Sequence, residues 1–298
     1  MIWHETLQHP KSGSDHGTIR RSRLSPLRWL DARRRVPPQP KNAIAGEIGE
    51  PCKVERAAVT SMAAPRLIVC GDAAFAVEFG DAVDPTLNGR VLGLDREVAA
   101  RGFAGIETVP TYRSLLVYVD PITADIEAIA EEVLAIARTV EADTSTPRRW
   151  RIPVVYGGDF GIDLAQLARF HGMTANEVVE RHVAPVYRVF MLGFMPGFAY
   201  LGGLDQRLAL PRRATPRAKV PSGSIKIGGV QAAVTSVEGP SGWHVIGRTP
   251  VRAFMPGRTP PFLLGPGDEL VFQPIPAERW KELDAQAGAG HLVAESIE

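Results

Sequence analysis

Residues 239–250 form the run Gly239-Pro240-Ser241-Gly242-Trp243-His244-Val245-Ile246-Gly247-Arg248-Thr249-Pro250. Glycines and prolines enclose a short apolar strand there, because glycine turns the chain easily and proline ends regular structure. The same texture extends from Val186 to about residue 277, with short apolar runs and no long helical period. Short strands separated by Gly/Pro-rich turns are typical of a compact β-barrel with irregular loops.

Residues 148–276 are predicted to hold this barrel, which begins with an alternating strand at 150–156. Two short helices follow that strand. The first is expected at 163–171, with Asp163 as its N-cap. The second is expected at 174–183, where Thr174-Ala175-Asn176-Glu177 makes a capping box. We expect residues 277–298 to form a C-terminal helix or tail.

Residues 64–145 show a different pattern, in which two pairs of strands alternate with two helices. The first helix is expected to begin at Asp84-Pro85, with Asp in the capping position and Pro in the first turn. The order ββ-α-ββ-α predicts a small α+β domain with its helices on one side of an antiparallel sheet. A polar break at 143–147 predicts the domain boundary. The expected strands are 66–70, 74–79, 106–109 and 114–119, and the second helix is expected at 123–141.

Residues 1–61 differ from the rest of the chain in charge. They carry eleven basic and six acidic side chains, a net charge of +5, whereas the remainder carries 23 basic and 27 acidic ones. The segment contains Val36-Pro37-Pro38-Gln39-Pro40 and few large apolar residues, so it buries too little apolar area to offset its ordering entropy. Three interpretations stay open: a disordered extension, a start codon chosen too early with Met62 as the natural beginning, or a targeting or nucleic-acid arm.

The composition is that of a globular protein, with 45% apolar and 22% charged residues in a chain of 298. No run of 18 apolar residues occurs, so we expect no membrane span. The net charge of +1 gives no argument for nucleic acid or an anionic membrane as a partner. Cys52 and Cys70 are too few for a disulfide framework and lack metal-ligand spacing, which favours a cytoplasmic protein with no metal site.

Common catalytic motifs are missing from the sequence. It has no Walker loop, no Gly-x-Gly-x-x-Gly after a strand, no His-Glu-x-x-His and no Gly-x-Ser-x-Gly elbow. We therefore do not expect a self-contained nucleotide hydrolase, dehydrogenase or zinc enzyme. The candidates for chemistry lie in the Gly/Pro-bounded segments of the barrel.

Three of these segments each allow a structural and a functional interpretation. Residues 193–205 combine glycines with aromatic side chains, as a structural loop or as a pocket wall and partner surface. Residues 211–224 present four cations between prolines, as a solvated face or as a site for carboxylate or phosphate. Residues 225–231 end in Gln231, which offers either a cross-strand hydrogen bond or a donor and an acceptor to an amide-like substrate.

The chain resembles the family that includes the KipI protein, the B-type subunit of 5-oxoprolinase (PxpB) and allophanate hydrolase subunit 1. The resemblance covers about residues 64–276 and implies a small N-terminal α+β domain followed by a cyclophilin-like β-barrel domain. It rests on the combination of Gly242-Trp243-His244-Val245-Ile246-Gly247-Arg248-Thr249-Pro250 with Phe194-Met195-Pro196-Gly197-Phe198 and Leu201-Gly202-Gly203-Leu204. The matching stretches are 154–161, 187–205, 210–224 and 239–250.

The resemblance implies a subunit of an ATP-dependent 5-oxoprolinase complex, which converts 5-oxo-L-proline to L-glutamate. It implies a C-type 5-oxoprolinase subunit as partner, a third subunit and a small-molecule substrate. An unstrained lactam resists hydrolysis, and ATP would convert its carbonyl oxygen to a phosphate leaving group, which requires cations and oxyanion donors. Since no nucleotide motif is visible, we expect ATP with Mg²⁺ at a shared interface or on a partner.

The site prediction has three parts. The predicted catalytic residues are Arg248, Gln231 and His182. The predicted substrate- or phosphate-binding residues are Arg212, Arg213, Arg217, Ser222 and Lys226. The predicted partner surface or pocket wall consists of Phe194, Pro196, Phe198, Tyr200 and Trp243.

Two departures from the family pattern bear on the substrate. The family usually continues Gly-Gly-x-Gln with Thr-Gly-Ile-Tyr-Pro, whereas Gln231 is followed here by Ala232-Ala233-Val234-Thr235-Ser236. Lys226 stands where family members tend to have a small residue. The alternatives are a non-catalytic inhibitor of a sensor histidine kinase, a subunit of an allophanate- or urea-degrading hydrolase, and a cyclophilin-like prolyl isomerase.

Overall fold

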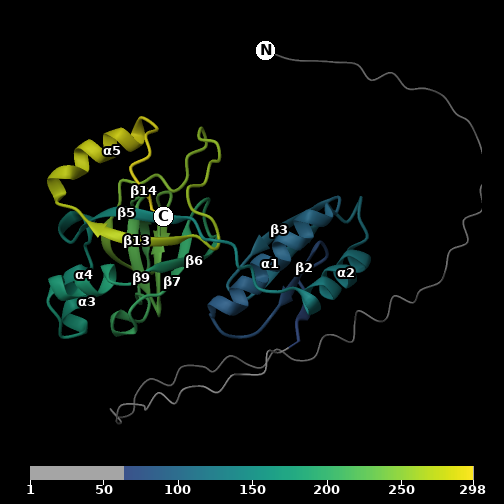
Figure 1. Ribbon diagram of the computed structural model, residues 1–298. Helices are drawn as coiled ribbons and strands as arrows, with labels where there is room; N and C mark the ends of the chain where they lie inside the picture. Colours follow the sequence, from purple (N-terminus) through teal and green to yellow (C-terminus); the bar gives the residue numbers. More distant parts are fainter. Residues whose placement is uncertain (1–63, 298) are drawn as a thin grey trace, which may run out of the picture. The chain divides into compact units, whose positions relative to one another are not determined.

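The computed structural model describes residues 64–297, and a closed β-barrel dominates its C-terminal half (Figure 1). The strands of the barrel sheet are β5 (Arg149–Tyr156), β6 (Tyr187–Leu192), β7 (Ala199–Gly202), β9 (Ser224–Gly228), β10 (Gln231–Val234), β12 (His244–Arg248), β13 (Glu269–Pro274) and β14 (Glu295–Ile297). Their order is β12-β9-β10-β7-β6-β13-β5-β14, and the pairing of β12 with the end of β5 closes the barrel. The barrel prediction is therefore confirmed.

Alternation along the strands divides the barrel into an apolar interior and an outer face. Ile225 and Ile227 of β9 are completely buried in the main core, together with Ala232 and Val234 of the neighbouring β10. Because successive side chains of a strand point to opposite faces, the residues between them point outward. This places Lys226 and Ala233 on the outer surface of the barrel wall.

Three helices lie on the outside of the barrel: α3 (Leu164–Phe170), α4 (Ala175–Val183) and α5 (Trp280–Gly288) (Figure 1). The capping box at the start of α4 is confirmed, because the side chains of Thr174 and Glu177 each bond the other's backbone N–H. Asp163 occupies the predicted N-cap position of α3, but its side chain makes no capping hydrogen bond. Beyond α5 the chain adds β14 to the sheet, so residues 277–298 are more than a helix and tail.

Short elements complete this half. The strands β8 (Arg217–Val220) and β11 (Gly239–Ser241) pair in a separate two-stranded sheet. Single 3₁₀ turns occupy Gly158–Phe160, Gln206–Leu208 and Ala277–Arg279.

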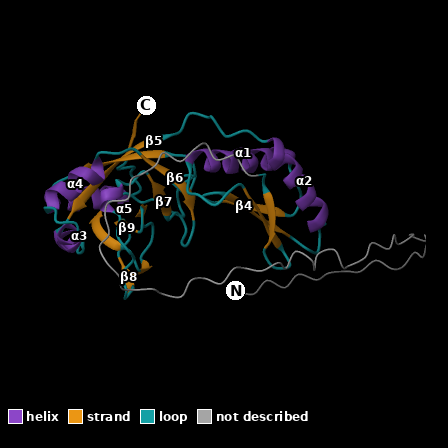
Figure 2. Ribbon diagram, turned by 90° about the horizontal axis from the view of Figure 1, so that it is seen from below, coloured by secondary structure: helices purple, strands orange, loops and turns teal. Residues whose placement is uncertain are grey.

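Residues 66–139 form a four-stranded antiparallel sheet of order β1-β2-β4-β3 with two helices on one side (Figure 2). Asp84 accepts hydrogen bonds from the N–H groups of Thr86 and Leu87, which confirms the predicted start of the first helix. Gly102 ends that helix at φ +64°, a left-handed conformation that glycine adopts without strain. The elements are β1 (Arg66–Val69), β2 (Ala74–Glu78), α1 (Pro85–Arg101), β3 (Ile106–Pro110), β4 (Ser114–Val119) and α2 (Ile126–Thr139).

The predictions for residues 1–61 lie outside the described residues. Within residues 64–297, no helix is both long enough and apolar enough to cross a membrane. Cys70 is exposed and forms no disulfide with another described residue.

Candidate functional site

An aromatic and cationic face covers the outer surface of β7, β9 and β10, and we call it the Lys226 face. Strand register sets it up, because Ala233 pairs with Lys226 on one side and with Tyr200 on the other. The small side chain of Ala233 lets aromatic side chains pack over it. Phe198 and Trp243 pack on the same surface as Ala233, in a cluster separate from the barrel core.

The rings of this face contact one another in a chain. The centroid of Phe198 lies 4.7 Å from that of Tyr200, which lies 6.0 Å from that of Trp243. Both distances fit the tilted and edge-on arrangements that aromatic side chains prefer. Gly228 is required beneath Trp243, because a Cβ there would lie 2.5 Å from the indole ring. Of the residues predicted as pocket wall, the structure therefore brings Phe198, Tyr200 and Trp243 together.

Lys226 lies among these rings and is only 1% exposed. Its Nζ lies 4.6 Å from the ring centroid of Phe198, within cation–π range. Nζ forms no ion pair or hydrogen bond with another residue of 64–297. Burial lowers the pKa of the Lys226 ammonium to about 8, because the charged form loses hydration.

Polar groups surround the aromatic rings. The guanidinium carbon of Arg212 lies 5.6 Å from the Trp243 ring centroid. Tyr112, from the β3–β4 connection, packs at 6.0 Å from Tyr200, and its buried hydroxyl has no hydrogen-bond partner among the described residues. Burial raises the pKa of Tyr112, while Gln231 and Arg212 counter that rise. Gln231 therefore faces this hydroxyl without meeting hydrogen-bond geometry.

The segment 193–198 borders the Lys226 face on one side. Phe194 is 64% exposed, adopts φ +69° and holds its ring 5.7 Å from that of Phe198. A non-glycine residue with positive φ is strained, and such strain persists only where surrounding contacts hold it. Ser236 supplies one such contact by donating a hydrogen bond to the carbonyl of Pro196. Phe194 and Pro196 therefore lie on a constrained loop, as a partner surface requires.

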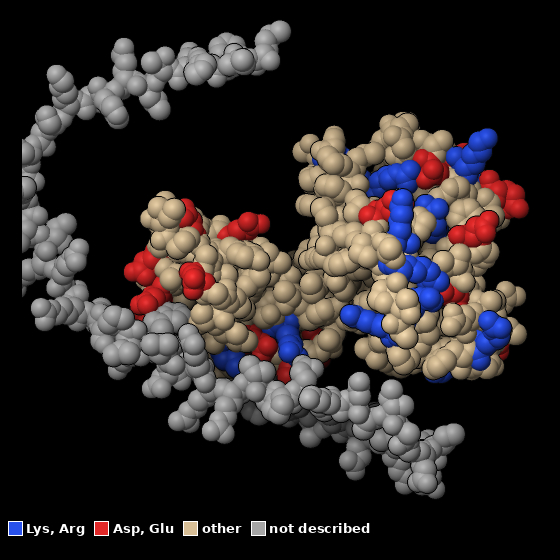
Figure 3. Space-filling view, turned by 180° about the vertical axis from the view of Figure 1, so that it is seen from behind, with Lys and Arg blue, Asp and Glu red and all other residues tan. Residues whose placement is uncertain are grey.

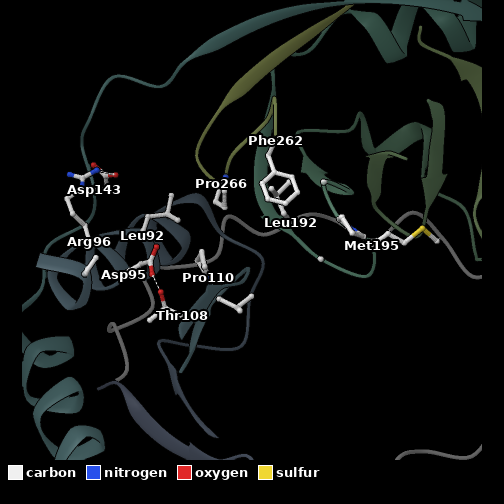
Figure 4. A pocket seen from close by; sticks show the side chains of 15 residues that line it. Leu92, Asp95, Arg96, Thr108, Pro110, Asp143, Leu192, Met195, Phe262 and Pro266 are labelled. Carbon is white, nitrogen blue, oxygen red and sulfur yellow. Dashed lines mark hydrogen bonds and ion pairs between the residues drawn. The ribbon is translucent and has the colours of Figure 1, made fainter. Parts of the chain in front are cut away.

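A cavity of about 610 Å³ lies on the other side of this loop (Figure 4). Leu192, Met195 and Phe262 line it together with residues of α1 and β3. Its polar lining is largely paired, since Thr108 donates a 2.6 Å hydrogen bond to Asp95 and an ion pair joins Arg96 to Asp143. Met195 also packs against the aromatic cluster of the Lys226 face, so the loop separates the two sites.

Two predicted phosphate-binding arginines are occupied elsewhere. Arg217 grips the buried carboxylate of Asp163 with two 2.7 Å hydrogen bonds, and Arg213 adds a third at 3.2 Å. The N–H of Val245 donates a fourth at 2.8 Å. Burial alone would raise the pKa of Asp163, but the bonds from Arg217 and Val245 outweigh it and lower this pKa. Asp163 is thus the anchor of the 211–217 segment.

Arg248 and Ser222 meet at a third location. Arg248 donates hydrogen bonds of 3.3 and 3.1 Å to the carbonyl oxygen of Ser222 and lies 4.7 Å from the centroid of Trp280. Burial lowers the pKa of Arg248. The structure thus joins Arg248 to α5 rather than to the Lys226 face, so the two predicted residues do not meet Lys226 or Gln231.

His182 lies in the barrel half, beside the main core, and is fully buried. Its ring stacks on Phe272 at 4.8 Å, and its Nδ1 lies 2.9 Å from the hydroxyl of Tyr156. Burial lowers the pKa of His182 to about 3, so the imidazole is neutral at physiological pH. His182 is thus packed among aromatic side chains of the core, which favours a structural role over the predicted catalytic one.

Basic side chains gather on one face of the barrel half, whereas acidic ones dominate the visible surface of the 64–145 segment (Figure 3).

Three residues of these sites were not predicted from the sequence: Tyr112, Trp280 and Asp163 in its role as an anchor. Tyr112 carries no motif, and Asp163 resembles a helix cap. The run of arginines at 212–217 is the one sequence signal that indicates a carboxylate partner for these side chains.

Comparison with known proteins gives the class of this fold and site. The family model "Carboxyltransferase domain, subdomain C and D" matches residues 65–264. The urea amidolyase of Kluyveromyces lactis superposes with a TM-score of 0.67 at 20% identity, over 78% of this chain and 16% of that one, and shows the fold alone. The barrel is therefore that of a carboxyltransferase-domain protein.

Curated relatives show which family within this class the chain resembles. The B-type 5-oxoprolinase subunit of Bacillus subtilis (strain 168) is 36% identical over 214 residues, which is 68% of this chain and 89% of that protein. Its counterpart of the same name in Escherichia coli O157:H7 is 42% identical over 170 residues, 57% of this chain and 78% of that protein. The chain belongs to the carboxyltransferase-domain family of KipI and PxpB, the B-type 5-oxoprolinase subunit, as its sequence motifs indicated.

Proposed function

We propose that this chain is a subunit of an ATP-dependent 5-oxoprolinase complex that converts 5-oxo-L-proline to L-glutamate. One observation carries the proposal: a protein named as the B-type subunit of 5-oxoprolinase matches over 89% of its length at 36% identity. The Lys226 face supports it, because aromatic rings suit a small cyclic amide and the surrounding cations suit its carboxylate.

Gln231 has a direct role in this proposal. Its side chain carries both an amide donor and an acceptor, which complement the C=O and N–H of a lactam. It lies at the start of β10, half-buried and facing Tyr112. We therefore assign Gln231 and Lys226 to substrate binding, with Arg212 at the edge of the site.

Most of the cations predicted to bind phosphate make contacts within this chain. Arg213 and Arg217 both bond the carboxylate of Asp163, and Arg248 is held between Ser222 and Trp280. Among residues 64–297, no group of three His, Cys, Asp or Glu side chains is placed to hold a metal ion. We therefore place ATP and Mg²⁺ on a partner or at a shared interface, and derive no step from them on this chain.

The partners in this proposal are a C-type 5-oxoprolinase subunit and a third subunit, in the cytoplasm. The side chains of Phe194 and Pro196 are the surface we assign to them, because apolar groups on a constrained loop lose little entropy on docking. We also propose that residues 64–145 act as a separate α+β domain and residues 148–276 as a cyclophilin-like barrel domain.

A deletion strain tests the biological role. We expect a strain without this chain to lose growth on 5-oxo-L-proline as sole nitrogen source and to regain it with the wild-type gene. Capture of the tagged chain from the native host should bring down a C-type 5-oxoprolinase subunit. Normal growth of the deletion strain, together with altered output of a sensor histidine kinase, would reverse the assignment in favour of a regulator.

A further inference from the structure

Among the described residues of the barrel half, Lys226 is the one lysine or arginine that is fully buried, and it has no counter-ion. Arg213 and Arg217 share the buried carboxylate of Asp163. An uncompensated buried charge is strongly destabilising, so proteins pair such charges unless a ligand supplies the partner. Lys226 is almost completely buried and forms no ion pair within residues 64–297.

The groups around Lys226 are donors or rings rather than acids. The ionisable side chains packed around this face are Tyr112, Tyr200 and Arg212, and none of them is acidic. The buried hydroxyl of Tyr112 also has no hydrogen-bond partner among the described residues. The ammonium of Lys226 contacts Phe198, and Tyr112 packs on Tyr200, the aromatic neighbour of Phe198. An ammonium and a hydroxyl without partners on one face form a complementary site for an anion.

The charge of the site favours a carboxylate over a phosphate. Lys226 brings the one buried positive charge of this face, because Arg212 is exposed at its edge, and one carboxylate neutralises that buried charge. A phosphate monoester carries nearly two negative charges at neutral pH and would leave an excess charge among apolar rings. The rings of Phe198, Tyr200 and Trp243 provide surface for the apolar part of a small ligand.

We propose that Lys226 binds the carboxylate of the substrate, so that the site selects small cyclic amides that carry an acid group. This assignment rests on the proposed function for the identity of 5-oxo-L-proline, but its chemistry applies to any small carboxylate. Since Nζ lies 4.6 Å from the ring centroid of Phe198, the proposal requires this ring to move aside when a ligand binds. The 193–198 loop that carries Phe198 also holds the strained Phe194.

Calorimetric titration of the full chain provides the test, with 5-oxo-L-proline, acetate, inorganic phosphate and 2-pyrrolidinone, which lacks the carboxylate. The variant is Lys226→Met, which keeps the side-chain volume and removes the charge. The matched control is Lys219→Met, whose exposed ammonium pairs with Glu238 at 2.8 Å. We expect Lys226→Met to weaken 5-oxo-L-proline binding at least about 30-fold, as loss of a desolvated charge partner does. Lys219→Met should bind like the wild type.

Two further measurements separate loss of the Lys226 charge from loss of folding. Thermal unfolding of Lys226→Met should show an unchanged or higher Tm, because an unpaired buried charge is removed. Wild-type affinity for carboxylates should fall about tenfold per pH unit above pH 8, where Lys226 loses its proton. Acetate binding that depends on Lys226, without any 5-oxo-L-proline binding, would retain the carboxylate site and reject the proposed substrate.

Two results overturn the proposal. One is a folded Lys226→Met chain that binds 5-oxo-L-proline as tightly as the wild type does. If such a chain also fails to capture its partner protein, Lys226 belongs to the partner interface and not to a ligand site. The other is Lys226-dependent binding of phosphate that is tighter than binding of either carboxylate.

Discussion

Acidification distinguishes a core histidine from a catalytic one at position 182. His182 is fully buried, and burial lowers its pKa from the ordinary 6.5 to about 3. The unfolded chain therefore binds a proton between these two pH values that the folded chain rejects. The stability of the folded state rises with pH wherever the unfolded state binds more protons. His182 therefore costs no stability above pH 6.5, and below that pH it lowers the stability of the folded state progressively.

The size of this loss follows from the two pKa values. Each pH unit in the window corresponds to about 1.36 kcal/mol, so the folded state loses about 2 kcal/mol between pH 7.5 and pH 5. His182→Asn removes the titration and keeps an acceptor for the hydroxyl of Tyr156. Its cavity lowers stability equally at both pH values, so the difference between the two chains isolates the proton.

Urea unfolding at pH 7.5 and pH 5 measures both chains. We expect the free energy of unfolding of the wild type to fall by about 2 kcal/mol more than that of His182→Asn over this interval. Equal pH dependence in the two chains would refute the core assignment. If the 5-oxoprolinase complex loses activity at pH 7.5 with a stably folded His182→Asn chain, His182 has a catalytic role after all.

Three further substitutions test other parts of the structure. Asp163→Ala should lower the free energy of unfolding by about 3–5 kcal/mol in urea titrations, because two arginines lose their buried partner. Gly228→Ala should lower it by about 1–3 kcal/mol and change tryptophan fluorescence, because the new Cβ overlaps Trp243. Phe194→Ser should leave Tm within a degree or two and weaken capture of the partner subunit at least about fivefold, since truncating a well-packed interface residue costs more than about 1 kcal/mol.

The two stability predictions each have a control in the same chain. Asp159→Ala removes an exposed carboxylate four residues before Asp163 and should leave stability unchanged. Gly257→Ala adds a Cβ with no atom within 4 Å and should be neutral. Partner capture by Phe194→Ser at wild-type strength would exclude the 193–198 loop from the interface. An Asp163→Ala chain as stable as Asp159→Ala would contradict the anchoring role.

Local patterns predicted most of the barrel because a few neighbouring residues are enough to indicate each of its elements. Strand alternation at 150–156 and the capping box at Thr174 depend only on neighbours in sequence, and both occur as expected. The position of Asp163 before the helix was predicted, but its side-chain partner was not, because Arg217 is 54 residues away in the sequence. A carboxylate before a helix has the same local pattern whether it caps that helix or binds a distant arginine.

The candidate site was predicted in pieces rather than as a whole. Phe198, Lys226 and Trp243 were each singled out, but only strand register and the Gly228–Trp243 packing bring them onto one face. Register is a long-range property that single segments do not reveal. Tyr112 joins them from outside the barrel, and no motif marks it.

Reconstitution measures the central claim, that this chain works as one subunit of a 5-oxoprolinase. Glutamate formation and ATP hydrolysis are followed with 5-oxo-L-proline for the purified chain, for its co-purified partners, and for the recombined set. We expect both activities only in the recombined set. Full activity from the single chain, or from the partners without it, would contradict the claim.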